Sequence, residues 1–339
     1  MQNAECTMQD KFSLSGLYHR EIPSLLAELA RTQSLLRLGR VGMNCGCEYT
    51  AFPLFAGGRS YSRLEHSLGV GLIVWHFTRD PAQAAAGLLH DVATPTFAHV
   101  VDFLRGDYLT QEATEDGTRE RIAGSPEIQK ILAGHGLTTD DAADYHRYPI
   151  ADNDSPRLSA DRLEYSLGNA LRWGFLTREE IDEIYGDLRV GVNEESIPEL
   201  VFGSPALASR FARAALACSR VYVSDADRYA MQMLSELLAR ALQTGALSPA
   251  DLEGTEPELI AKLEVSPLAA DWQRFRELHR VRRAETPPDR RPWRQIPAKK
   301  RRIDPLVEGF GRVSAIDPDF AAALAAFLAE PQTEWLLGE

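Results

Sequence analysis

The segment that most constrains this chain is a run of small and apolar residues ending in an adjacent histidine and aspartate, Ala84-Ala-Ala-Gly-Leu-Leu-His90-Asp91. Its composition predicts a tightly packed helix, and the Thr94-Pro95 pair that follows disfavours a further helical turn. Burying a carboxylate without a partner is costly, so a buried Asp91 is expected to be paired or to bind a metal. A helix cap or a surface pair is the commoner explanation of an isolated His-Asp dipeptide.

Apolar residues recur at helical spacing along most of the chain, which predicts an all-α fold. Ser62 and Glu65 have the spacing of a capping box, and Asp80-Pro81 is a start signal for the helix that carries His90. A short hairpin is expected only within residues 190–202. The expected helices cover residues 22–38, 61–77, 81–91, 97–104, 126–133, 159–173, 175–185, 204–246 (as one helix or two), 249–265 and 268–283, with an apolar tail at 320–327 and an exposed Trp335.

Length and composition exclude several classes of protein. With 339 residues, of which 44% are hydrophobic, the chain can bury a large core as one big domain or two. Its net charge of −12 argues against a nucleic-acid-binding role. The sequence shows no signal segment and no apolar run near the roughly 20 residues of a membrane helix. We therefore expect a cytoplasmic protein without a membrane partner, whose four cysteines are free thiols.

A basic cluster lies within residues Arg290–Arg302, where lysine and arginine alternate with proline. One interpretation is a solvated loop, since charge runs commonly face water. The other is a site for an anionic ligand or a partner, because an acidic total charge does not forbid a small basic pocket.

Three helical segments carry isolated metal-ligand residues in the order H…HD…D. They contain Arg63-x-x-His66-Ser-Leu-Gly-Val, the His90-Asp91 run that continues to Phe97-Ala-His99, and Asp161-Arg-Leu-x-Tyr165. From about residue 22 to residue 173 the chain resembles the HD-domain metal-dependent phosphohydrolases. Within them it is most similar to the deoxynucleoside triphosphate triphosphohydrolase branch.

The resemblance implies an HD-domain helical bundle with additional C-terminal helices. Residues 1–175 would form the core with the metal site, and residues 176–339 would complete the pocket and pack on the core as one unit. His66, His90, Asp91 and Asp161 would bind one divalent ion, for which Mn, Fe, Ni, Zn and Mg all suit imidazole and carboxylate ligands. A homo-oligomer is expected by the same analogy.

The resemblance also assigns roles around that ion. Arg63, one helical turn from His66, would hold a phosphate as a planar donor and act in catalysis with Asp91. Tyr165 matches a sugar-contacting tyrosine, and Asn169 stands where a sugar-contacting aspartate is common. Thr94 belongs to the expected substrate-binding residues.

The chain departs from that branch where its catalytic histidines stand. Thr94 occupies the place of one histidine and Gln111 that of a second, while Glu112 is retained. Because a general acid contributes about 10²–10⁴ in rate, another group must move the proton if the chain is an enzyme. Glu112, Glu115, Asp102 or His99 could do so. Glu112 and Glu115 are the first candidates, and a structural role is the preferred interpretation of His99.

Three functions are compatible with these residues. The leading hypothesis is a metal-dependent phosphohydrolase acting on a small phosphorylated ligand such as a nucleotide. A metal- and nucleotide-binding sensor without turnover would explain Thr94 and Gln111 directly. A di-iron oxygenase is the third, and it would need further ligands, which His99 or Glu112 could supply.

Overall fold

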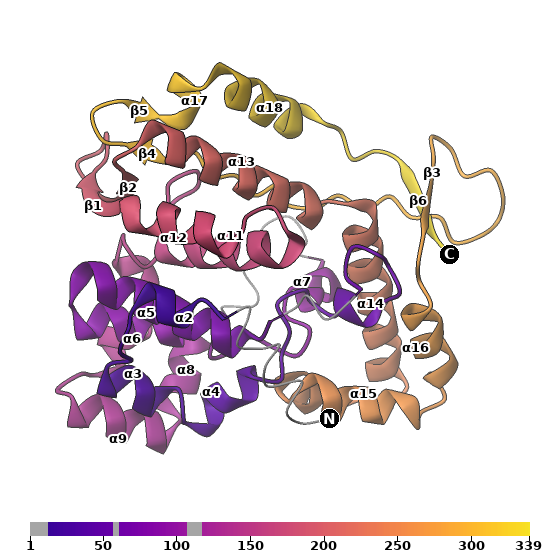
Figure 1. The fold of residues 1–339 in the computed structure, drawn as a ribbon. Coiled ribbons are helices and arrows are strands. Elements are labelled where there is room, and N and C mark those ends of the chain that lie inside the picture. The colour runs from indigo at the N-terminus through magenta and orange to yellow at the C-terminus, as the bar shows by residue number, and fades with distance from the viewer. Residues whose placement is uncertain (1–12, 57–60, 107–116) are drawn as a thin grey trace.

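The computed structural model describes residues 13–56, 61–106 and 117–339. This part of the chain is mainly helical, as the periodicity predicted (Figure 1). The helices before residue 188 are α2 (Ser15–Tyr18), α3 (Ser24–Leu29), α4 (Gln33–Leu38), α5 (Arg63–Thr78), α6 (Pro81–Leu89), α7 (Val100–Arg105), α8 (Thr118–Ala123), α9 (Pro126–Gly134), α10 (Thr139–Ala142), α11 (Ala160–Trp173) and α12 (Arg178–Asp187).

The helices after residue 188 are longer at first and shorter toward the end of the chain. The segment 204–246 forms two helices, because α13 ends at Tyr222 and the Ser224 side chain caps α14 by accepting from the Asp227 backbone N–H. The full set is α13 (Pro205–Tyr222), α14 (Asp225–Gln243), α15 (Glu256–Glu264), α16 (Ala269–Arg276), α17 (Val313–Ile316) and α18 (Pro318–Ala329), with 3₁₀ turns η1 (Cys47–Tyr49), η2 (Tyr145–Arg147) and η3 (Pro249–Glu253).

Helices α5 and α6 form the tightest pair and lie at the centre of the first half of the chain. The predicted capping box of Ser62 and Glu65 is present at the start of α5. Gly71 and Gly87 allow the two helices to approach. A Cβ atom on Gly71 would lie 3.0 Å from the Leu88 Cβ, and one on Gly87 would lie 3.2 Å from a Val74 methyl group. This close contact fixes the spacing of the side chains that the two helices carry.

The predicted hairpin is confirmed by strands β1 (Leu188–Val192) and β2 (Pro198–Phe202). Strand β2 also pairs in parallel with β4 (Leu306–Val307), which pairs with β5 (Gly311–Arg312), so the sheet order is β1-β2-β4-β5. The mainly helical class therefore stands, with a small sheet added by a distant segment. Local periodicity does not reveal the joining of β2 to β4 because that pairing is long-range.

The predicted helix over residues 268–283 is wrong at its end. Helix α16 ends at Arg276, and residues Val281–Ala284 form β3, paired antiparallel with β6 (Trp335–Gly338). Trp335, expected to be exposed, is partly buried in β6. The pairing with a far segment overrides the local helical preference of these residues.

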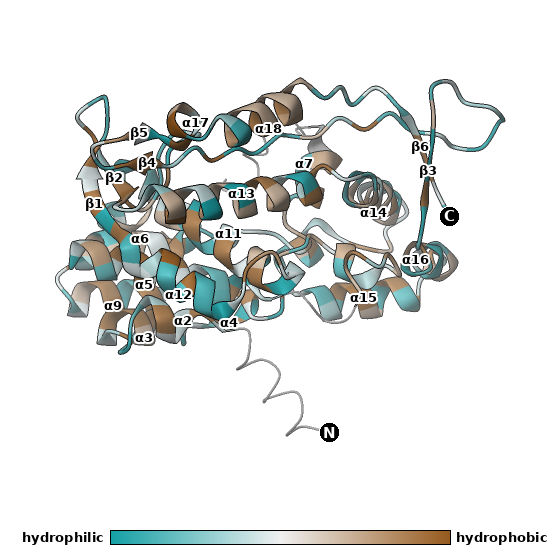
Figure 2. Cartoon of the chain, turned by 45° about the horizontal axis from the view of Figure 1, so that its top comes forward, coloured by the Kyte–Doolittle hydropathy of each residue, from teal (hydrophilic) through white to brown (hydrophobic). Residues whose placement is uncertain are grey.

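Side chains from both halves of the chain form one hydrophobic cluster, which includes Leu26, Phe211, Trp272 and Phe320. Figure 2 shows the matching pattern on the ribbon, with hydrophilic stretches on the outer helices α12 and α16. Among the described residues no helix is long and apolar enough to cross a membrane. Cys45, Cys47 and Cys218, the cysteines in the described part, are free thiols as expected.

Candidate metal centre

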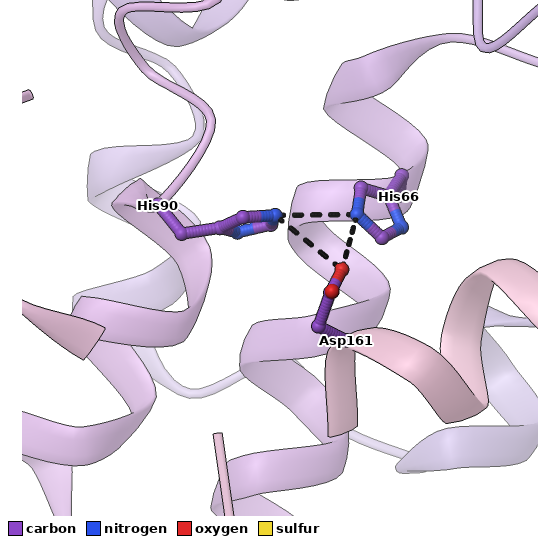
Figure 3. A group of neighbouring side chains, drawn as sticks. All are labelled: His66, His90 and Asp161. Carbon is purple, nitrogen blue, oxygen red and sulfur yellow. Dashed lines mark hydrogen bonds and ion pairs between the residues drawn. The ribbon is translucent and has the colours of Figure 1, made fainter. Parts of the chain in front are cut away.

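Three of the predicted metal ligands meet at one point (Figure 3). His66 lies in the first turn of α5, His90 directly follows α6, and Asp161 lies in the first turn of α11. The His66 Nε2 atom is 3.2 Å from the His90 Nε2 atom and 3.1 Å from the Asp161 Oδ1 atom. The His90 Nε2 atom is 3.7 Å from the same carboxylate oxygen. Two imidazole nitrogens and a carboxylate thus face one small volume.

The other nitrogen of each imidazole is held by an oxygen. The His66 Nδ1 atom is 2.6 Å from the Glu164 Oε2 atom, and the His90 Nδ1 atom is 2.7 Å from the Gly87 carbonyl oxygen. Each Nδ1 therefore carries the proton that it donates, and each Nε2 is left to bind a proton or a metal ion in the shared volume. A proton on one Nε2 can satisfy the facing pair, and a divalent cation would take the place of that proton. This donor set fits a divalent ion.

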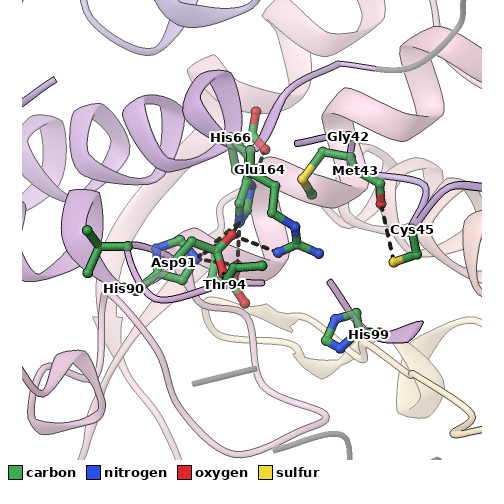
Figure 4. Close-up of polar contacts among 12 residues, drawn as sticks. Gly42, Met43, Cys45, His66, His90, Asp91, Thr94, His99 and Glu164 are labelled. Carbon is green, nitrogen blue, oxygen red and sulfur yellow. Dashed lines mark hydrogen bonds and ion pairs between the residues drawn. The ribbon is translucent and has the colours of Figure 1, made fainter. Parts of the chain in front are cut away.

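Asp91 completes the group from the residue after His90. Its Oδ2 atom lies 3.9 Å from the His66 Nε2 atom and 3.7 Å from the His90 Nε2 atom, and it accepts a hydrogen bond from Arg63 at 2.8 Å. Its other oxygen accepts from the Thr94 hydroxyl at 2.7 Å (Figure 4). The carboxylate is thereby fixed on both sides.

The position of Thr94 differs from the expectation that it binds substrate. Its side chain is fully buried and does not line the cavity described below. Its hydroxyl instead orients Asp91, which explains a polar residue at a buried position. The Thr-Pro turn that ends the helical run places it there.

The electrostatics of the cluster favour a bound cation. Burial alone lowers the pKa of the His66 imidazole, but Asp161 and Glu164 raise it to about 10. Burial raises the pKa of the Asp161 carboxyl, yet the two imidazoles lower it to about 2. Arg63 and the imidazoles likewise hold the pKa of Asp91 far below its usual range. Two carboxylates that stay ionised beside two imidazoles therefore attract positive charge.

A cavity of about 870 Å³ adjoins the cluster and is lined from both halves of the chain. Arg63, Tyr165 and Asn169 all lie on its wall, as a substrate-contacting role requires. The Asn169 amide donates to the Tyr222 hydroxyl at 2.8 Å, and the Tyr165 and Tyr222 rings meet edge to face. From beyond residue 176 the wall includes Tyr222, Asp227, Met231, Lys299, Lys300, Arg301, Arg302 and Leu328.

His99 also lies on this wall, although it was expected to be structural. Phe97 and Ala98 both have positive φ angles, of 61° and 46°, and this turn directs the chain into α7. The His99 Nδ1 atom lies 2.8 Å from a carboxylate oxygen of Asp102, which is fully buried. The Nε2 atom, 3.4 Å from a guanidinium nitrogen of Arg301, is the ring nitrogen left for other contacts. A histidine oriented by a buried carboxylate is an arrangement typical of proton transfer.

Sequence reasoning missed Glu164, whose carboxylate orients His66 and also accepts from Tyr61 at 3.0 Å. The available signal was its position one turn after Asp161, but a glutamate on an amphipathic helix usually faces water. The predicted proton-transfer residues Glu112 and Glu115, together with Gln111, lie outside the described residues.

No family model matches the chain. It is 27% identical over 254 residues to the uncharacterized protein YdhJ of Bacillus subtilis, covering 74% of each chain. It is 26% identical over 215 residues to the metal-dependent phosphohydrolase cns2 of Cordyceps militaris, covering 61% of this chain and 57% of that protein. The solved structure of the phosphohydrolase BT4208 from Bacteroides thetaiotaomicron superposes with a TM-score of 0.65 at 18% identity, covering 94% of this chain and 96% of that one.

These similarities support the expected relationship to HD-type phosphohydrolases, and the solved structure shows that the fold is shared over nearly the whole chain. Together with the cluster of His66, His90 and Asp161 they indicate a metal site. The identity of the ion does not follow from them.

Proposed function

We propose that the protein is a metal-dependent phosphohydrolase that acts on a small phosphorylated ligand of the nucleotide type. The observation that carries this proposal is the meeting of His66, His90, Asp91 and Asp161 on the wall of a cavity of about 870 Å³. A cavity of this size accommodates a nucleotide-sized ligand. The printed name of the cns2 relative supports the same class of reaction.

The four residues would hold one divalent ion of the set Mn, Fe, Ni, Zn or Mg. When bound, such an ion supplies Lewis acidity and lowers the pKa of a coordinated water. Arg63 fixes Asp91 with one guanidinium nitrogen and lies on the cavity wall, so it can also bind a phosphate oxygen. Tyr165 and Asn169 would contact the remainder of the ligand.

We assign the proton transfer to His99, oriented by Asp102. In hydrolysis the water loses a proton as its oxygen bonds to phosphorus, the bond to the leaving oxygen breaks, and that oxygen takes up a proton. Burial, Arg301 and Arg63 lower the pKa of His99 in the free site. A bound phosphate adds negative charge beside these cations, which raises the pKa of the imidazole and enables it to carry the proton. Glu112 or Glu115 would be the alternative carriers.

The surroundings of His99 bear on the oxygenase hypothesis. A second iron on His99 would have to lie beside the guanidinium of Arg301, which is 3.4 Å from its Nε2 atom. Repulsion between the two cations disfavours that arrangement. One ion per chain is therefore the expectation. We also propose that both parts of the chain work as one unit in a cytoplasmic homo-oligomer, as the resemblance implies.

The test combines elemental analysis with a phosphate-release screen of nucleoside mono-, di- and triphosphates in Mn²⁺. We expect one metal per chain and turnover, both lost in His90→Ala and Asp161→Ala. His135→Ala is the matched control, because this histidine pairs with Glu28 far along the chain from the cluster residues. One metal without turnover on any nucleotide would favour the sensor, and two irons with oxygen consumption would favour the oxygenase.

A further inference from the structure

The basic cluster of the sequence contributes a defined wall of the cavity. Its last four residues, Lys299–Arg302, all line the cavity, and we call them the basic strap. Arg290 and Arg291, from the same cluster, are exposed and lie outside the cavity lining. Four consecutive cationic residues on one wall stand out in a chain whose net charge is −12. The interpretation as a solvated loop therefore does not describe residues Lys299–Arg302.

The backbone of the basic strap is held on both flanks. Just before it, the Ala298 N–H donates to the Gln332 side chain at 2.7 Å. At its end the carbonyl of Arg302 accepts from the Ser155 hydroxyl at 2.9 Å, and the Asp304 N–H donates to the Pro156 carbonyl at 2.8 Å. The strap is thus fixed across the cavity between the loop that precedes α11 and the segment that follows α18.

The four cations have different surroundings. The Lys300 ammonium donates to the carbonyls of Leu328 and Glu330 at the end of α18, so it serves as an anchor. Arg301 reaches the His99 imidazole. Lys299 and Arg302 also line the cavity, and Arg302 is exposed. The strap therefore extends positive charge from the proposed proton carrier toward the rim of the cavity.

Among the residues that the structure describes, the carboxylates on the cavity wall outside the metal cluster do not cancel this charge. Asp152 forms an ion pair with Arg162 at 3.1 Å, and its other oxygen lies 2.9 Å from the His146 Nδ1 atom. Burial raises the pKa of Asp227 to about 8, which leaves it mostly uncharged at neutral pH. Asp154 is exposed, with Arg157 at 4.0 Å. Among the described residues of the wall outside the metal cluster, cationic side chains therefore outnumber ionised carboxylates.

We propose that the basic strap binds a second anionic group of the substrate, separate from the phosphate that lies at the metal ligands and Arg63. The inference rests on the proposed function for the identity of the first phosphate and names the class of substrate, a small molecule with two phosphate groups. A monophosphate would fill only part of the cavity, and the strap would take no part in binding it. The second phosphate either follows the first in a chain or stands elsewhere on the ligand.

The test measures binding to the Mn²⁺-loaded full chain by calorimetry, with phosphate release followed in the same samples. The probes are adenosine 5′-monophosphate, adenosine 5′-diphosphate and adenosine 3′,5′-bisphosphate, which separate the two placements of the second phosphate. We expect at least one of the last two to bind about tenfold or more tightly than the monophosphate, as a charge-assisted contact predicts. Equal affinities for all three would overturn the inference without any variant.

A pair of double variants then locates the subsite. Lys299→Ala with Arg302→Ala should remove the preference and leave the affinity for the monophosphate unchanged. Arg290→Ala with Arg291→Ala removes the same charge outside the cavity and should keep the preference. An equal loss in both pairs, or a loss of monophosphate binding in the first, would contradict a separate subsite. A preference for two phosphates with no phosphate release from any probe would leave this inference standing while rejecting the hydrolase.

Discussion

The cavity has two walls that are built in different ways. On one wall the metal-cluster residues stand on helix ends, are largely buried, and are oriented by further side chains such as Glu164 and Thr94. On the other wall the basic strap has no regular secondary structure and is held through backbone groups at its flanks. The difference separates two tasks. In the proposed function the helical wall would fix the geometry of the reacting groups, whereas the strap would present positive charge to the ligand.

The sharpest test of the helical wall is Asp91→Ala. We expect loss of activity to background and a fall of about 3–5 kcal/mol in the free energy of unfolding, because Arg63 becomes a buried charge without its partner. Urea unfolding measures the second effect. Asp140→Ala breaks the exposed pair with Arg119 and should leave the free energy of unfolding nearly unchanged. If the free energy of unfolding fell by a similar amount in both variants, burial of the Arg63–Asp91 pair would not determine its contribution to stability.

His99→Asn tests the point where the two walls meet. We expect kcat to fall by about 10²–10⁴ while KM changes little, since the imidazole moves a proton rather than binding the ligand. The pH dependence of the remaining activity should lose the limb that belongs to this group. His279→Asn, at an exposed position, is the control and should behave as the wild type. If kcat/KM fell by the same factor because KM rose while kcat stayed unchanged, His99 would have a structural role.

Glu164→Gln tests whether metal binding at the helical wall depends on residues that do not face the ion. The amide keeps the volume but weakens the hold on the His66 Nδ1–H, so metal affinity should fall by about 10–100-fold. Titration with a competing chelator gives the affinity directly. Glu179→Gln, in the first turn of α12, is the control for a glutamate remote from the cluster. Unchanged affinity in Glu164→Gln would mean that His66 needs no orienting partner.

Thr94→Val should have the smallest effect. It removes one hydrogen bond to Asp91 and leaves a side chain of similar shape, so stability should fall by about 1–2 kcal/mol. The affinity for phosphate ligands should not change, because the hydroxyl does not reach the cavity. A selective loss of ligand binding with unchanged stability would restore the original substrate-binding interpretation of Thr94.

The two walls also differ in how far the sequence predicts them. The helices that carry His66, His90 and Asp161 follow from local spacing and from start signals such as Asp80-Pro81, because capping and periodicity act within a few residues. The orienting role of Glu164 does not follow, since a glutamate on such a helix ordinarily faces water.

The strap and the β3–β6 pairing were beyond local reasoning for a related reason. Residues 281–284 find their partner at 335–338, and the strap finds its anchors at Ser155, Pro156 and Gln332. These contacts depend on how the whole chain closes on itself. The basic composition of residues 290–302 therefore indicated an anionic site as one option, but not its place on the cavity wall.

The contact between Gly71 and Gly87 has a mechanical consequence. With no side chain between them at this point, the two helices meet almost backbone to backbone. The Gly87 carbonyl oxygen also accepts a hydrogen bond from the His90 ring. The close approach therefore fixes the distance between the two helix backbones that carry His66 and His90. Because Arg63 and Thr94 already hold the Asp91 carboxylate, we expect Asp161, the most exposed of the four residues, to adjust most to ions of different radius.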